Sequence, residues 1–249
     1  MISIVTPVYN AAAFIRQTME MVRAQEYTDW ELILVDDCSK DNSCEVIEEY
    51  IKEKPDARIR LIKKEKNEGA ALTRNRGIKE ARGRYIAFLD ADDVWLPHKL
   101  QTQMEFMNKT ECGFVFAAYE FGDEEAVGTG KVVHVPESLT YKKALSRTVI
   151  FTTSVLLDTK KIPKELIYMP NVPSEDSATW WQILRAGYVA KGIDEVLAIY
   201  RRPAKSLSSN KLKAIQRIWY LYREVEKLSL FASVVAFAGW AYRATVRRL

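Results

Sequence analysis

The sequence predicts an α/β fold, with a mostly parallel central sheet that carries helices on both faces. Short apolar runs alternate with amphipathic segments through the first ninety residues, and polar or turn-forming residues follow each run. The order strand, helix, strand indicates parallel pairing, because each helix returns the chain to the same end of the sheet. The 249 residues are 48% hydrophobic and 28% charged, a balance typical of globular proteins with a large core.

The first elements support this prediction in order. Ile2–Val5 is an apolar run that ends at Thr6 and Pro7, and Ala11–Gln25 repeats apolar residues at helical spacing. Leu32–Val35 is a second apolar run, which ends at two aspartates. A helix, a strand, a helix and a strand are expected to follow over Glu45–Lys54, Ile59–Ile62, Gly69–Ala81 and Tyr85–Leu89. Ligands of such sheets bind beyond the carboxyl ends of the strands, so we expect a site there.

The second half of the body is less regular. A helix, a strand, a helix and a strand are expected over Leu96–Asn108, Gly113–Phe121, Ser174–Gly187 and Val189–Tyr200. Residues 122–130 have the composition of a loop, and residues 131–160 fit neither the helical nor the strand period. We therefore expect one domain over residues 1–210, with two halves, 1–100 and 101–210.

The C-terminal tail, residues 211–249, differs from the rest in charge. It has eight basic and two acidic residues, so within a net charge of +4 the preceding part is slightly acidic. An acidic body argues against a nucleic-acid partner, because a protein that binds nucleic acid needs basic residues over its folded surface. Two amphipathic helices are expected in the tail, over residues 211–227 and 228–247, and their basic residues favour attachment to an anionic membrane surface.

Leu228–Tyr242 is the apolar part of this tail. Its 15 residues are fewer than the ~20 that span a bilayer, so we expect a helix in the membrane interface, with Trp240 and Tyr242 at the depth of the headgroups. A helix packed on the body and the interface of a homodimer are the alternatives. The sequence begins without a signal-peptide pattern, and its three cysteines lack disulfide spacing, which together predict a reducing, cytoplasmic setting.

Two acidic clusters follow strands of the predicted sheet. Asp90, Asp92 and Asp93 come after the fourth strand, where carboxylates one residue apart can share Mg²⁺ or Mn²⁺. Asp36 and Asp37 end the second strand, where a carboxylate can accept a hydrogen bond from a nucleobase or a ribose. For each cluster, a solvated turn that caps the next helix is the alternative. Two such clusters in one fold favour a nucleotide site more than either does alone.

Four segments resemble the N-terminal signature of family 2 glycosyltransferases. They are Thr6–Asn10, Val35–Ser43, Asn67–Gly69 followed by Arg74–Gly77, and Tyr85–Asp93. The resemblance is ordered over residues 1–100 and continues more weakly to residue 210. It implies the GT-A fold, an inverting reaction, a nucleotide-sugar-binding first half and an acceptor-binding second half. The nearest members are bacterial enzymes that build cell-envelope polysaccharides such as capsule, O-antigen or teichuronic acid.

The resemblance also implies roles for residues of the first half. Thr6, Pro7 and Asp37 would line the pocket for the nucleotide base. Asp92 would be a direct metal ligand. Asp90 would contact the ribose or a metal-bound water, as the second member of the metal site.

In the second half, Ser174–Asp176 matches a later acidic pair of the family and makes Asp176 the candidate general base. The spacing alone favours the other interpretation, in which Glu175 and Asp176 supply favourable charge in the first turn of a helix, and the resemblance reverses that preference. The family often has Tyr-Arg-x-His after the closing strand, whereas this chain has Tyr200–Pro203, without the His. Three cations lie in this segment or just after it, and they would neutralise a diphosphate directly, belong to a solvated basic loop or form part of the membrane-facing patch. They are Arg201, Arg202 and Lys205.

Other residues of chemical interest are expected to be structural. His98 starts a helix and His134 lies in an ill-defined strand, so neither is expected to act in catalysis. Trp180 and Trp181 would stack on a sugar or, as aromatic residues of a helix more often do, belong to the core.

These observations predict an inverting glycosyltransferase that depends on Mn²⁺ or Mg²⁺. It would move a hexose from a UDP-sugar to a saccharide hydroxyl on a polyprenyl-diphosphate-linked glycan, as a peripheral protein at the cytoplasmic face of a bacterial inner membrane. Two alternatives remain. One is transfer onto polyprenyl monophosphate itself, and the other is a non-catalytic subunit that binds a nucleotide sugar or a glycan.

Overall fold

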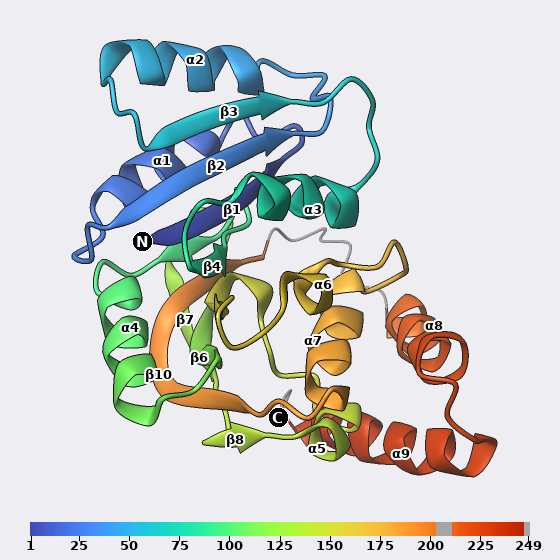
Figure 1. Ribbon diagram of the computed structural model, residues 1–249. Helices are drawn as coiled ribbons and strands as arrows, with labels where there is room; N and C mark the ends of the chain where they lie inside the picture. The colour runs from blue at the N-terminus through green and yellow to red at the C-terminus, as the bar shows by residue number, and fades with distance from the viewer. Residues whose placement is uncertain (203–210, 247–249) are drawn as a thin grey trace.

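The computed structural model describes residues 1–202 and 211–246, and a ten-stranded sheet runs through the body (Figure 1). The strands are β1 (Ile2–Val8), β2 (Trp30–Asp36), β3 (Ile59–Lys63), β4 (Tyr85–Phe88), β5 (Val94–Trp95), β6 (Phe114–Gly122), β7 (Gly128–Val133), β8 (Ser138–Leu139), β9 (Leu156–Asp158) and β10 (Ala190–Arg201). The helices are α1 (Ile15–Arg23), α2 (Ser43–Glu53), α3 (Ala70–Glu80), α4 (Lys99–Thr110), α5 (Tyr141–Leu145), α6 (Lys164–Ile167), α7 (Glu175–Arg185), α8 (Lys211–Tyr220) and α9 (Leu230–Val246), with the short turns η1 (Thr152–Ser154) and η3 (Leu221–Val225). The strand order is β3-β2-β1-β4-β9-β6-β10-β5, with β7 beside β6 and β8 beside β10.

The strands β3, β2, β1 and β4 pair in parallel, as the sequence predicts. All seven residues of β2 are buried, which is typical of a parallel strand covered on both faces. Helix α3 packs on β1 and β2 on one face, and α1 and α2 pack together on the other (Figure 1). The approach of α3 is close, because a Cβ atom on Gly77 would lie 2.4 Å from Cγ1 of Val5.

The second half of the sheet is mixed. Strand β9 pairs antiparallel with both β4 and β6, whereas β10 runs parallel to β6. The sequence left residues 131–160 unassigned because strands as short as β8 and β9 have too few side chains for an alternating pattern to show. Trp180 of α7 covers the junction of the two halves, where its ring packs against Phe88 of β4 and Phe114 of β6.

The tail helices pack on the body along one side. The ring of Tyr222 stacks on Trp181 of α7 with centroids 5.5 Å apart, and its hydroxyl donates to the carbonyl of Leu145. The buried carboxylate of Glu226 accepts a hydrogen bond from Arg185 at 2.6 Å. The tail was expected to lie in a membrane interface, to pack on the body or to form a dimer interface. On the side that carries Tyr222 and Glu226, the structure shows packing on the body.

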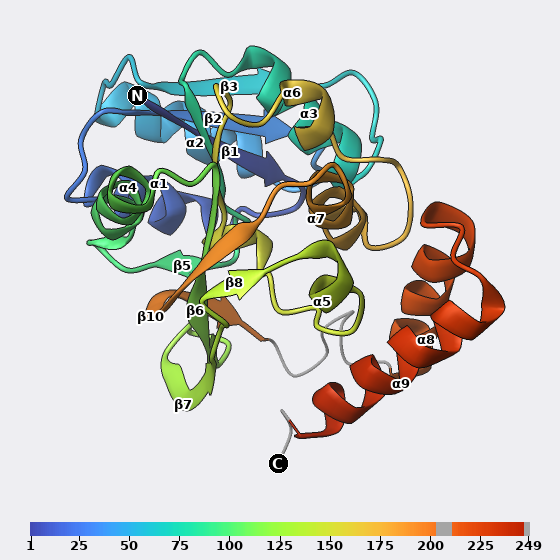
Figure 2. The same ribbon diagram turned by 60° about the horizontal axis from the view of Figure 1, so that its bottom comes forward.

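The other side of α9 faces solvent, and Figure 2 shows α8 and α9 at the outer edge of the molecule. This side carries a row of exposed apolar side chains, called the α9 stripe below. Its members are Leu230, Phe231, Val234, Val235 and Tyr242. Trp240 does not belong to it, contrary to the prediction, because its indole N–H donates to the hydroxyl of Thr148 at 3.1 Å and so faces the body. None of the helices within residues 1–202 and 211–246 has both the length and the apolar composition that crossing a bilayer requires.

Candidate functional site

The ends of β1, β2 and β4 open onto a cavity of about 670 Å³, called the strand-end cavity below. It is lined by Pro7–Ala11 at the end of β1, by Asp37 after β2 and by Asp90–Asp92 after β4, and the loop before α3 closes it with Asn67 and Gly69. The carboxyl ends of parallel strands meet at one edge of a sheet. The two acidic clusters found in the sequence therefore share one cavity.

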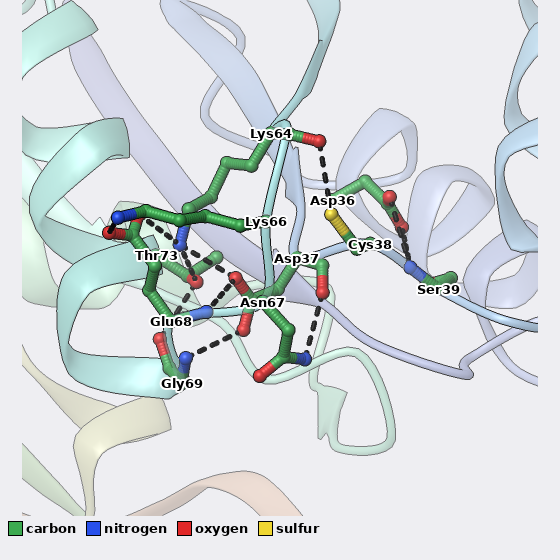
Figure 3. A network of polar contacts seen from close by, with 10 residues as sticks. All are labelled: Asp36, Asp37, Cys38, Ser39, Lys64, Lys66, Asn67, Glu68, Gly69 and Thr73. Carbon is green, nitrogen blue, oxygen red and sulfur yellow. Dashed lines mark hydrogen bonds and ion pairs between the residues drawn. The ribbon is translucent and has the colours of Figure 1, made fainter.

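Asp37 is 3% exposed and holds the loop that precedes α3 (Figure 3). Its Oδ1 accepts hydrogen bonds from the Lys64 ammonium at 2.6 Å and the Glu68 N–H at 2.9 Å, and its Oδ2 accepts one from the Gly69 N–H at 2.8 Å. Burial alone would raise the pKa of Asp37, but these donors hold that pKa below its ordinary value. A carboxylate oxygen has two lone pairs, so Oδ2 can accept one more hydrogen bond, from a ligand in the strand-end cavity.

Thr6 and Pro7 differ in position, although the family resemblance implies that both line the pocket for the nucleotide base. Pro7 lines the strand-end cavity, as expected. Thr6 is fully buried and is not among the lining residues, and its hydroxyl has no hydrogen-bond partner among the described residues. Successive side chains of a strand point to opposite faces, so the Thr6 side chain lies outside the strand-end cavity, and its role at a nucleotide base stays a prediction.

The three aspartates after β4 have different surroundings. Asp92 is exposed at the strand-end cavity, and the surrounding protein atoms and the charge of Asp90 raise its pKa. Asp93 is buried and accepts hydrogen bonds from the Thr153 hydroxyl at 2.6 Å and the Arg201 N–H at 3.3 Å. Burial and its two acidic neighbours raise the pKa of Asp93 well above its ordinary value. Asp93 therefore fixes the turn, whereas Asp90 and Asp92 face the cavity.

Arg74 of α3 is a buried link between two acidic segments. Its guanidinium pairs with Asp90 at 2.6 Å and with Glu175 of α7 at 3.0 Å. Burial disfavours a charge on Arg74, but these carboxylates raise its pKa above the ordinary value. Burial and the charge of Asp176 raise the pKa of Glu175. The sequence places Arg74 in a family motif, but nothing in it pairs this arginine with a glutamate 101 positions away.

A second cavity of about 660 Å³, called the α7 cavity below, adjoins the first, because Arg74 and Asp90 line both. Asp176, the second residue of α7, lines the α7 cavity. Its Oδ1 accepts the Ser177 N–H at 2.6 Å, and its Oδ2 lies 3.4 Å from the hydroxyl of Thr152. Aromatic rings form much of the remaining wall: Tyr119, Phe151 and Tyr200. A carboxylate thus faces a ring-lined space beside the acidic pair.

Comparison with known proteins identifies the chain at this point. The sequence profile of glycosyl transferase family 2 matches residues 3–161. The chain belongs to this family. This family 2 glycosyltransferase is 41% identical over its whole length, and over 98% of the relative, to TuaG of Bacillus subtilis (strain 168), which is named as a teichuronic acid biosynthesis glycosyltransferase. It is 36% identical, over 88% of the chain and 84% of the relative, to WfgD of Escherichia coli, a UDP-Glc:alpha-D-GlcNAc-diphosphoundecaprenol beta-1,3-glucosyltransferase.

Solved structures share the fold of this family 2 glycosyltransferase. The mannosyltransferase PcManGT from Pyrobaculum calidifontis, in complex with GDP-Man and Mn²⁺, matches with a TM-score of 0.74 and 18% identity, over 98% of this chain and 75% of that one. S. aureus TarS 1–349, in complex with UDP-GlcNAc, matches with a TM-score of 0.70 and 17% identity, over 97% and 70% of the two chains. These matches confirm the GT-A fold that the sequence predicts.

Arg201 at the end of β10 and Arg202 after it are the arginines that the sequence predicts as diphosphate contacts. Arg201 is buried, and its guanidinium donates three hydrogen bonds within the protein, one of them to the carbonyl of Asp92 at 2.7 Å. Arg202 is exposed, with its guanidinium 5.0 Å from the ring centroid of Phe121, and it lines neither cavity. Arg201 therefore fixes the Asp92 turn, neither arginine lines one of the two cavities, and their contact with a diphosphate stays a prediction. Lys205 lies outside the described residues.

The residues expected to be structural have structural surroundings. His98 and His134 each lie 3.1 Å from an acidic side chain of β10 and line neither cavity. Trp180 and Trp181 are 2% exposed. Of the two interpretations of this tryptophan pair, the core is therefore the one observed.

Asp92 and Asp90 fit a divalent cation as part of its ligand set. Across residues 1–202 and 211–246, no three acidic, His or Cys side chains gather closely enough to hold a metal by themselves. Mg²⁺ and Mn²⁺ prefer oxygen ligands, keep several waters and take further oxygens from substrate phosphates. Two carboxylates at the edge of a nucleotide-sized cavity are therefore a sufficient protein contribution.

Proposed function

We propose that this glycosyltransferase moves a hexose from a UDP-sugar to a saccharide hydroxyl on a polyprenyl-diphosphate-linked glycan, with inversion at the anomeric carbon. The observation that carries the proposal is the meeting of two cavities at Asp90 and Arg74. Asp37, Asp90 and Asp92 line the strand-end cavity, where they would bind the nucleobase and the metal, and Asp176 lines the α7 cavity. A donor and an acceptor would thus react where the cavities join.

The chain's own residues would bind the donor, orient the two substrates and deprotonate the acceptor hydroxyl. Asp92 and Asp90 would hold Mg²⁺ or Mn²⁺, which when bound supplies positive charge to the departing diphosphate. Asp176 would accept the proton of the acceptor hydroxyl while that oxygen forms a bond to the anomeric carbon. The bond from this carbon to the diphosphate breaks on the opposite face, so an α-linked donor gives a β-linked product. Arg74 would hold Asp90 and the start of α7 in fixed positions relative to each other, through its ion pairs with Asp90 and Glu175.

The named substrates of relatives support the choice of donor and acceptor. Two Escherichia coli relatives, WfgD and WfaP, are named as UDP-Glc enzymes that act on alpha-D-GlcNAc-diphosphoundecaprenol, and each is 36% identical to this chain. TarS was solved with UDP-GlcNAc, whereas PcManGT was solved with GDP-Man. A UDP-sugar donor and a diphosphate-linked acceptor are therefore proposed here, with GDP as the comparison nucleotide.

We also propose a peripheral position at the cytoplasmic face of the inner membrane, and the α9 stripe supports the contact with a membrane that this position requires. Phe231 is 79% exposed and Leu230 is 62% exposed, which is costly in water and favourable among lipid tails.

Calorimetry of UDP binding tests the donor site, with Mn²⁺ present and then chelated, and with GDP as the comparison. We expect binding that is selective for UDP and weaker without metal. Transfer is then followed with a UDP-hexose and a diphosphate-linked acceptor, and the anomeric configuration of the product is read by NMR. Binding of neither nucleotide would favour a non-catalytic subunit. Transfer to polyprenyl monophosphate, without need of a saccharide, would support the other alternative.

A further inference from the structure

The α7 cavity receives a residue from the tail as well as from the body. Arg217 of α8 lines it, on the wall completed by Tyr200 and Thr148. Arg74 is the other cation among the described lining residues, and its charge is matched by Asp90 and Glu175. Within residues 1–202 and 211–246, no ion pair or hydrogen bond engages the guanidinium of Arg217. The cavity therefore has an acidic end and an unmatched positive charge.

The position of Arg217 is fixed by the packing of α8. The next residue, Ile218, is 5% exposed, and Leu221 one turn further is 1% exposed, so this side of the helix is held against the body. Trp219 packs edge-on against Phe237 of α9 with ring centroids 5.9 Å apart. Arg217 is thus carried by the same packed unit as the α9 stripe, and docking of that stripe on a bilayer would hold Arg217 above lipid.

We infer that Arg217 binds the diphosphate of the lipid-linked acceptor, while the acceptor sugar occupies the ring-lined space between Arg217 and Asp176. This inference rests on the proposed function and adds a residue that recognises the acceptor. A guanidinium donates two parallel hydrogen bonds to phosphate oxygens and keeps its charge at all physiological pH values. The acidic end of the α7 cavity would repel a diphosphate, so the charges also orient the acceptor with its hydroxyl toward Asp176.

Two soluble probes test the inference without a membrane. One is N-acetylglucosamine α-linked through a diphosphate to a short alkyl chain, and the other is the same alkyl glycoside without phosphate. We expect the wild-type protein, with UDP bound, to bind the diphosphate probe more tightly than the glycoside. Arg217→Gln should weaken binding of the diphosphate probe by roughly 10- to 100-fold, the loss expected for a charged hydrogen bond, and leave the glycoside and UDP unaffected. Arg217→Lys should restore part of the loss.

Lys227→Gln is the matched control, because it removes one positive charge from the same tail at an exposed position that pairs only with Glu224, at 3.2 Å, among the described residues. It should leave binding of both probes unchanged. The inference is overturned if Arg217→Gln binds the diphosphate probe like the wild type, if both variants weaken it equally, or if the wild type does not distinguish the probes. Each of these results concerns binding of the probes only, and none of them contradicts UDP binding or sugar transfer by the wild-type protein. A wild-type protein that neither binds UDP nor transfers a sugar would instead refute the proposed function.

Discussion

Replacement of Arg74 by glutamine should destabilise the protein strongly. The side chain of Arg74 is 7% exposed, and its partners Asp90 and Glu175 are 28% and 23% exposed. Removal of one member of a buried ion pair leaves the other charge unpaired, which costs about 3–5 kcal/mol. For a chain of this size, 1 kcal/mol corresponds to about 2–4 °C in melting temperature. We therefore expect a decrease of about 6–20 °C at neutral pH.

The stability lost in Arg74→Gln should depend on pH and should be larger in base than in acid. Burial and the charge of Asp176 raise the folded-state pKa of Glu175, while Arg74 opposes that rise. Removal of Arg74 raises this pKa further. A carboxyl whose folded pKa is raised contributes stability that is fully present below its unfolded pKa, about 4.3, and is lost as the pH rises through the folded pKa. The variant should therefore be closer to the wild type in acid than in base.

Urea unfolding of the wild type and Arg74→Gln, at about pH 5 and about pH 8, measures this difference. Arg76→Gln is the control, because Arg76 lies two residues away on the same helix with its side chain 49% exposed and pairs with Glu80 at 3.1 Å. An exposed pair of this type contributes about 0.3–0.5 kcal/mol. The reasoning is wrong if Arg74→Gln costs no more than Arg76→Gln, or if its cost is the same at both pH values.

Three further predictions concern the site and the tail. Asp176→Asn should keep UDP binding but slow transfer by roughly 10²- to 10⁴-fold; transfer at the wild-type rate would remove Asp176 as the base. Asp92→Asn should reduce the effect of Mn²⁺ on UDP affinity measured by calorimetry, and an unchanged metal dependence would place the ion elsewhere. Phe231→Ser combined with Val235→Ser should release the protein from anionic vesicles in a sedimentation assay without lowering its melting temperature, since both side chains are exposed. Sedimentation equal to that of the wild type would give the α9 stripe another role.

The double substitution replaces a simpler experiment, deletion of the whole tail. Tyr222 and Glu226 are buried against the body, with Tyr222 stacked on Trp181. Deletion of residues 211–249 would expose that surface, so a loss of membrane binding could follow from misfolding. Substitutions confined to the exposed side of α9 separate the two effects.

The sequence alone was sufficient for the first hundred residues. Parallel strands are continuous apolar runs when both faces are covered, and the helices between them are long enough for the helical period to show. The strand ends then placed Asp37, Asp90 and Asp92 at one edge of the sheet, where the structure has the strand-end cavity. The family motifs lie in the same region, which is why fold and family could both be predicted there.

Only the tertiary structure decided which cations line a cavity. Arg201, Arg202 and Arg217 all lie in the basic C-terminal part of the sequence, next to apolar residues. Arg201 is buried and donates to the carbonyl of Asp92, 109 positions earlier, whereas Arg217 of α8 lines the α7 cavity together with the first residues of α7. Hydrophobic periodicity reports the neighbours of a residue within one or two turns of a helix. Whether a guanidinium meets a backbone carbonyl, an aromatic ring or a cavity depends on chain segments a hundred residues apart, and those meet only in the folded state.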